Sequence, residues 1–154
     1  RCYKKYQKNN IAKRANYLNF KDKTEEDFNL YKSVFGGEFE GKVARFSEVP
    51  PSPDIPCPSK QDGNLIMHVC LPILGGTRLM GTDAPESMGF KIIPGNNIYI
   101  SLHPDTKAET DKLFKGLSDG GKVEQPLQEM FWGDYYGSVV DRFGVKWMFN
   151  CTEK

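Results

Sequence analysis

Two segments of the chain repeat the same spacing of apolar and polar residues. Residues 26–34, EDFNLYKSV, align with residues 109–117, ETDKLFKGL, at a constant offset of 83 positions. In both, apolar side chains recur at the three- and four-residue spacing of an amphipathic helix, and residues able to cap a helix come before them. A glycine pair follows each segment, as is common where a helix ends. The pattern predicts one helix in each segment.

A strand-like stretch precedes each predicted helix, at residues 16–20 and 97–103, and several β-prone runs follow it. The runs after the first helix are GKVARFSEV, LIMHVCLPI and TRLMGTD, and those after the second are KVEQPLQ, DYYGSVVD and VKWMFNC. The order is therefore β-α-β-β-β, twice. It predicts an α+β fold in which two tandem modules form curled, mostly antiparallel sheets around a cavity.

This pattern divides the chain into four parts. We expect a flexible basic N-terminal extension over residues 1–14, a first module over 15–83, a linker over 84–96 and a second module over 97–152. Five of the ten prolines fall between residues 50 and 58, and this density excludes a regular element there. That segment is either a loop near the mouth of a cavity or a passive linker.

Two tight turns determine which strand residues share a face. A two-residue turn at Gly75 and Gly76 would pair Leu71 with Met80, which places Met67 on the cavity face and His68 on the opposite one.

A four-residue turn over 141–144 would place Gly137 opposite Met148, with Trp147 and Phe149 directed away from the cavity. Small residues at Gly81 and Gly137 would then leave room for a ligand or a neighbouring chain.

Four motifs resemble the PhnB-like branch of the vicinal oxygen chelate superfamily, which includes glyoxalases, bleomycin resistance proteins and dioxygenases. They are LYKSVFGGEFEG, GGTRLMGTDAP, PGNNIYISLH and FWGDYYGSVVDRFGVKWMFNC, and the resemblance covers about residues 15–152. It implies two cup-shaped modules that are usually completed in a homodimer, so we expect a homodimer. It also implies, for the enzymes of the superfamily, a divalent metal held by His, Glu or Gln from the first and last strand of each module.

The positions that correspond to these metal ligands look like Asn16, Met80, Asn97 and Met148. Two amides and two thioethers give a hard divalent cation no anionic ligand. We therefore expect no cofactor. A divalent metal stays an alternative, with His68, Glu129 and Asp134 as reserve ligands.

The resulting hypothesis is a metal-independent protein that binds an unknown small molecule in an apolar, adaptable pocket. The predicted pocket residues are Asn16, Met80, Asn97, Trp132, Tyr135, Met148 and Asn150. One alternative is a metal-dependent lyase, isomerase or dioxygenase of the same superfamily, and another is a purely structural dimer. Whether the protein is an enzyme stays open.

Charge and hydropathy exclude several other classes. With 21 basic and 20 acidic residues the formal net charge is +1, which does not fit a general nucleic-acid binder. No segment approaches the roughly 20 apolar residues of a membrane helix, so we expect a cytoplasmic protein without membrane or nucleic-acid partners. The four cysteines have no CxxC spacing, and reduced thiols are expected. Proteins of this kind are sometimes labelled demethylubiquinone methyltransferases, but no strand here leads through a glycine-rich turn into a helix that could cradle a nucleotide cofactor.

Overall fold

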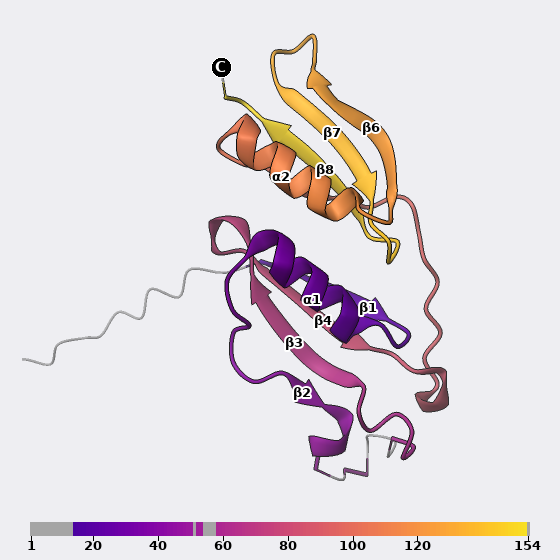
Figure 1. The fold of residues 1–154 in the computed structure, drawn as a ribbon. Coiled ribbons are helices and arrows are strands. Elements are labelled where there is room, and N and C mark those ends of the chain that lie inside the picture. Colours follow the sequence, from indigo (N-terminus) through magenta and orange to yellow (C-terminus); the bar gives the residue numbers. More distant parts are fainter. Residues whose placement is uncertain (1–13, 51, 54–57, 154) are drawn as a thin grey trace, which may run out of the picture.

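The computed structural model describes residues 14–50, 52–53 and 58–153 (Figure 1). The predicted N-terminal extension lies outside these residues except for its last position. The first half contains β1 (Ala15–Phe20), α1 (Thr24–Phe35), β2 (Ala44–Arg45), β3 (Ile66–Pro72) and β4 (Arg78–Asp83). The second half contains β5 (Ile100–Leu102), α2 (Lys107–Ser118), β6 (Lys122–Glu129), β7 (Tyr135–Val140) and β8 (Lys146–Cys151).

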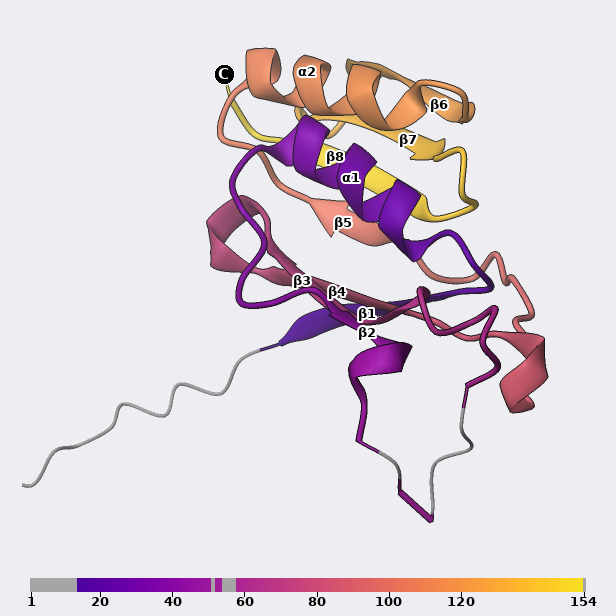
Figure 2. The same ribbon diagram turned by 60° about the horizontal axis from the view of Figure 1, so that its bottom comes forward.

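Two four-stranded sheets have the same topology. Their strand orders are β1-β4-β3-β2 and β5-β8-β7-β6. The pairs β1/β4 and β5/β8 are parallel and the other pairs are antiparallel. Figures 1 and 2 show α1 against the first sheet, α2 against the second, and the two helices next to each other. The predicted fold class is confirmed.

One apolar core fills the space between the helices and the sheets. It includes Phe28 and Tyr31 of α1, Leu117 of α2, and Trp147 and Phe149 of β8, all buried. The prediction that Trp147 is a core residue is therefore confirmed, and Phe149 lies in the same core. Among the described residues, no helix has the length and apolar character needed to cross a membrane.

The predicted register of the first hairpin is wrong by one residue. Leu71 pairs with Leu79 rather than with Met80. The reason is the turn: Ile73 donates its N–H to the carbonyl of Thr77 at 2.8 Å, so three residues rather than two connect the strands. The shift exchanges the faces of the paired β3 residues, so Cys70 rather than Leu71 shares a face with Met80. Met67, which precedes this paired stretch, still lines a cavity.

The predicted register of the second hairpin is wrong for the same reason. Asp141 donates its N–H to the carbonyl of Val145 at 2.9 Å, which leaves a three-residue turn. Met148 therefore pairs with Ser138, and Gly137 lies opposite Phe149 on the helix side.

The two strand glycines make room for the helices, not for a ligand as predicted. A Cβ atom at Gly81 would lie 2.8 Å from Cζ of Phe28 in α1, and one at Gly137 would lie 2.9 Å from Cε2 of Phe114 in α2. Real Cβ contacts are longer than this, so each glycine lets an aromatic ring of the helix pack directly on the strand.

A buried carboxylate joins the two halves of the chain. Oδ2 of Asp141, in the β7–β8 turn, accepts hydrogen bonds from the Tyr31 hydroxyl at 2.5 Å and from Trp147 Nε1 at 2.9 Å. Oδ1 of Asp141 accepts the backbone N–H groups of Phe143 and Val145 at 2.9 and 3.0 Å. Four donors thus compensate the desolvation of one charge, and Tyr31 brings one of them from α1.

A second buried carboxyl group, that of Asp27, lies one turn before Tyr31 on α1. Its side chain is fully buried and neither oxygen has a hydrogen-bond partner, because Tyr31 donates to Asp141 instead. Burial raises the pKa of Asp27 to about 8, and the charge of Asp141 acts in the same direction. Asp27 is therefore protonated in the folded protein at neutral pH.

We expect Gly81→Ala to lower the free energy of unfolding by about 1–3 kcal/mol, as overpacking against Phe28 typically does. Chemical denaturation measures the change. Gly95→Ala is the matched control, because its Cβ would come no closer than 3.4 Å to any atom. Combining Gly81→Ala with Phe28→Leu should restore part of the lost stability. Equal stability of Gly81→Ala and Gly95→Ala would contradict the packing argument.

We expect Asp27→Asn to flatten the dependence of stability on pH. The folded-state pKa of about 8 lies above the ordinary 3.8, so between these values the folded protein keeps a proton that the unfolded chain has lost. Near the middle of this pH range, the ionisation of Asp27 alone should then lower the free energy of unfolding of the wild type by roughly 1.4 kcal/mol per pH unit. Asparagine has no such proton, so the free energy of unfolding of the variant should increase relative to that of the wild type as the pH rises toward 8.

Urea denaturation at several pH values within this window makes the comparison. Asp22→Asn, at an exposed position next to α1, is the control and should keep the slope of the wild type. An unchanged slope in Asp27→Asn would show that Asp27 is already ionised in the fold.

Candidate functional site

The face of the first sheet that points away from α1, here called the first open face, carries a mixed set of side chains. In β1, Leu18 and Phe20 pack in or against the core, so the alternating residues face outward. The strand pairings place the members of this face side by side: Tyr17 and Asn19 of β1, Met80 and Thr82 of β4, and His68 and Cys70 of β3.

No side chain of the first open face has the environment of an activated nucleophile. The Tyr17 hydroxyl lies 3.2 Å from Nδ1 of His68, and burial raises the pKa of the tyrosine. The Cys70 thiol donates to Glu40 at 3.7 Å. Burial first, and then the charge of Glu40, raise the pKa of Cys70, which keeps the sulfur protonated and unreactive at neutral pH.

The corresponding second open face belongs to the sheet of the second half. The pairings place Met148 of β8 between Ser101 of β5 and Ser138 of β7, and Asn150 beside Tyr136. Asn150 donates Nδ2–H to Asp134 at 2.9 Å. The ring of Trp132 packs edge-on against Tyr136, with 6.0 Å between centroids. Hydroxyl, amide, thioether and aromatic groups therefore share this face.

An apolar cavity of about 650 Å³ opens beside the first open face. Asn19 and Thr82 of that face form part of its wall. The rest comes largely from methionine and aromatic side chains that lie before β3, in β3 itself and in the segment after β4: Phe46, Met67, Met88 and Phe90. Such a wall is apolar and can adjust to the shape of a ligand.

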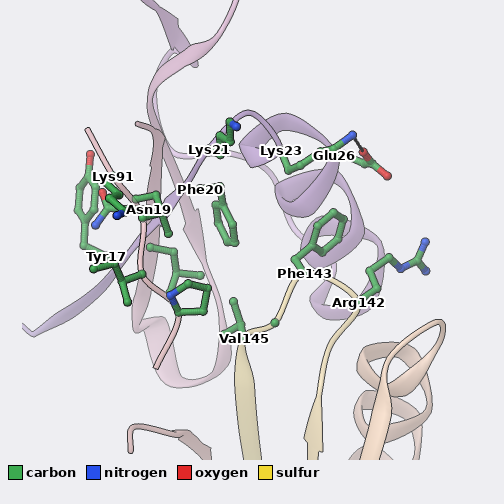
Figure 3. Close-up of a pocket in the computed structure, with 15 residues that line it drawn as sticks. Tyr17, Asn19, Phe20, Lys21, Lys23, Glu26, Lys91, Arg142, Phe143 and Val145 are labelled. Carbon is green, nitrogen blue, oxygen red and sulfur yellow. Dashed lines mark hydrogen bonds and ion pairs between the residues drawn. The ribbon is translucent and has the colours of Figure 1, made fainter. Parts of the chain in front are cut away.

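A second cavity, of about 710 Å³, lies where the end of β1, the 84–96 segment and the β7–β8 turn meet. We call it the intermodule cavity. Figure 3 shows the rings of Phe20 and Phe143 in its centre, and their centroids lie 6.4 Å apart. Charged side chains surround these rings.

Three of the predicted pocket residues lie on an open face: Met80 on the first, and Met148 and Asn150 on the second. Trp132 reaches the second open face from the β6–β7 loop through Tyr136. Asn97 is exposed and lies outside β5.

The other two predicted pocket residues are directed elsewhere. Asn16 pairs with the buried Leu79, so it lies on the helix side. Tyr135 donates its hydroxyl to Asp111 of α2 at 2.8 Å. The structure therefore does not gather the seven predicted residues into one pocket.

Sequence reasoning missed Asn19, Thr82 and Tyr136. The alternation of Leu18 and Phe20 with polar neighbours in β1 was a signal that could have identified Asn19. Thr82 and Tyr136 required the correct turn lengths.

The three reserve metal ligands lie apart. His68 is on the first open face, beside Tyr17, and not on the opposite face as predicted. Glu129 pairs with Lys107 of α2 at 2.5 Å, and Asp134 is bound to Asn150. Among the residues that the structure describes, no group of three His, Cys, Asp or Glu side chains could hold a metal ion.

A family model described as 3-demethylubiquinone-9 3-methyltransferase matches residues 12–149. The chain belongs to this family. It is 29% identical to protein YjdN of Escherichia coli over 90% of this chain and 94% of that protein.

A solved structure is similar over almost the whole chain. The crystal structure of protein PA1353 from Pseudomonas aeruginosa has 33% sequence identity to this chain and a TM-score of 0.78. The similarity covers 92% of this chain and 98% of the PA1353 chain.

Two more distant structures show the fold. A PhnB protein from Bacillus cereus, titled a putative 3-demethylubiquinone-9 3-methyltransferase, has 24% identity and a TM-score of 0.68 over 90% of this chain and 98% of its own. A glyoxalase/bleomycin resistance protein/dioxygenase family enzyme from Burkholderia phytofirmans has 19% identity and a TM-score of 0.58. The similarity covers 89% of this chain and 97% of that one. The predicted PhnB-like, glyoxalase-type resemblance is confirmed.

Proposed function

We propose that the protein binds small, largely apolar molecules in the apolar cavity, without a divalent metal. The observation that carries this proposal is the wall of that cavity, which is made mostly of apolar side chains, methionine and aromatic ones among them. Its polar members are Asn19, Thr82, Asp83 and Lys91. A volume of about 650 Å³ lies within the range of small-molecule sites. The apolar wall provides affinity, and the amide and the hydroxyl orient the ligand.

The donor set does not fit the metal that the superfamily implies. Its metal ligands come from the first and last strand of each module, which here are β1, β4, β5 and β8. On the open faces these strands carry a phenol, amides, hydroxyls, thioethers and two cations: Tyr17, Asn19, Arg78, Met80, Thr82, Ser101, Lys146, Met148 and Asn150. None is a carboxylate or an imidazole, the ligands that hold such cations best. No step of the proposed function uses a metal.

Methyltransferase activity, which the description of the family names, has less support. A nucleotide cofactor requires a glycine-rich turn between a strand and the helix that follows. The connections that lead into α1 and α2, at residues 21–23 and 103–106, contain no glycine.

The same proposal includes a homodimer. Several aromatic side chains on or near the open faces are exposed, among them Tyr17 at 48%, Trp132 at 48% and Phe131 at 96%. A second copy that places its second open face over the first open face of its partner would cover these residues and close the apolar cavity. The shared topology and the repeated helix sequence also support an origin of the two modules by internal duplication.

Binding of N-phenylnaphthylamine, an uncharged aromatic dye that fluoresces in apolar surroundings, tests the site. We expect saturable binding that Met67→Trp reduces at least tenfold, because the larger indole projects into the space that the dye occupies. Met67→Leu keeps the volume and should bind like the wild type. The affinity should not change after dialysis against EDTA, because no metal takes part.

Phe90→Ala provides an independent variant, since Phe90 lines the cavity and is too exposed to act as a core residue. It should weaken dye binding without lowering the thermal midpoint. Wild-type affinity in both Met67→Trp and Phe90→Ala would place the dye elsewhere and reject the proposed site.

Light scattering at micromolar concentration should give twice the monomer mass. Trp132→Lys should shift the protein toward the monomer, because a charge would then lie in the proposed interface. Lys60→Glu, at an exposed site outside the strands of both sheets, is the control. A wild type that is monomeric at every concentration would contradict the homodimer.

A further inference from the structure

The apolar cavity and the intermodule cavity share part of their walls. Asn19, Lys91 and Ile92 line both. Asn19 is near the end of β1, whereas Lys91 and Ile92 belong to the segment that connects the two halves of the chain. A molecule bound in the apolar cavity can therefore reach the intermodule cavity past Lys91.

The intermodule cavity has an excess of positive charge. Four basic side chains line it, those of Lys21, Lys23, Lys91 and Arg142, against one acidic side chain, that of Glu26. Figure 3 shows Lys21, Lys23 and Arg142 around the central rings, with Lys91 beside Tyr17 and Asn19.

Lys91 differs from the other three cations. Lys23 pairs with Glu26 at 3.3 Å, Lys21 with Glu86 at 3.3 Å, and Arg142 with Asp119 at 2.9 Å. Within the described part of the chain, no acidic side chain forms an ion pair with Lys91. The lysine at the shared wall is thus the cation most available to a ligand.

The surroundings of Lys91 are largely apolar. Phe20, Phe143 and Val145 contribute apolar surface to the intermodule cavity, and the neighbouring Ile92 belongs to both walls. A bound molecule would exclude water from this region, which strengthens the attraction between an ammonium group and an anion. An apolar site with one available cation at its edge suits a molecule that has both an apolar part and an anionic group.

We infer that the ligand is an amphipathic anion, whose apolar ring or chain occupies the apolar cavity and whose anionic oxygen group meets Lys91 at the wall shared with the intermodule cavity. This inference rests on the proposed function, because the apolar cavity must bind a ligand first. It adds the class of that ligand: a molecule with a carboxylate, sulfonate or phosphate group on an apolar body.

Two dyes with the same ring system test the inference. Anilinonaphthalene sulfonate is N-phenylnaphthylamine with a sulfonate group, so the ratio of their dissociation constants isolates the contribution of the anion. The wild type should bind the sulfonate more tightly by about fivefold, the order expected of one partly exposed charge pair. This advantage should decrease with added salt, whereas binding of the neutral dye should not.

Lys91→Gln should remove the advantage of the sulfonate, so that the two dyes bind with similar affinities. Lys91→Arg keeps the charge and should retain most of the advantage. Lys60→Gln removes an exposed lysine that lines neither cavity and should behave like the wild type. Lys91 is exposed and lies outside the helices and strands, so these variants should fold.

The possible results separate the two proposals. If the wild type binds neither dye, the proposed function fails and the inference fails with it. If the neutral dye binds and the sulfonate binds no more tightly, the inference alone is wrong. It is also wrong if Lys91→Gln weakens both dyes equally, or if Lys60→Gln lowers the sulfonate affinity as much as Lys91→Gln does.

Discussion

The buried carboxylate of Asp141 is the interaction on which the arrangement of this protein depends. An isolated charge in a protein interior is very costly, and here four hydrogen bonds compensate it. Two of the donors are backbone N–H groups of the β7–β8 turn, so the carboxylate closes that turn. The other two, Tyr31 and Trp147, place α1 of the first half against β8 of the second. Because the Tyr31 hydroxyl donates its hydrogen bond to Asp141, the nearby Asp27 has no donor to stabilise a charge, and burial raises its pKa.

The same carboxylate determines which surfaces remain for a ligand. The turn that it closes sets the register of β8, and so directs Trp147 and Phe149 into the core and Met148 and Asn150 outward. The helices then pack on one side of each sheet, and aromatic rings occupy the space above the strand glycines. The two larger cavities lie elsewhere, one beside the first open face and one where the two halves meet.

The sequence was sufficient for the fold because the signals that specify it are local. Apolar spacing and glycine ends identify α1 and α2, and the alternation in WMFNC correctly orients β8. The candidate site was harder to predict because it depends on turn length. Whether Gly75 and Gly76 form a two- or three-residue turn depends on the hydrogen bond between Ile73 and Thr77, and the second turn depends on the side chain of Asp141. A change of one residue in turn length decides whether Tyr135 or Tyr136 lies on the open face, and on which face His68 lies.

Asp83 has a role in the first half that resembles that of Asp141 in the second. It is buried at the end of β4 and accepts the backbone N–H groups of Thr24 at 3.0 Å and Ile66 at 2.7 Å, which ties the start of α1 to the start of β3. The chain leaves β4 directly after this anchor and enters the segment that contains Lys91. The core of the first half thus holds the start of that segment, which forms one wall of the intermodule cavity. The opposite wall contains Phe143, which lies in the turn that Asp141 closes in the second half. In the proposed function the ligand lies between walls that these two buried aspartates position: Asp83 through the start of the segment that contains Lys91, and Asp141 through the turn that contains Phe143.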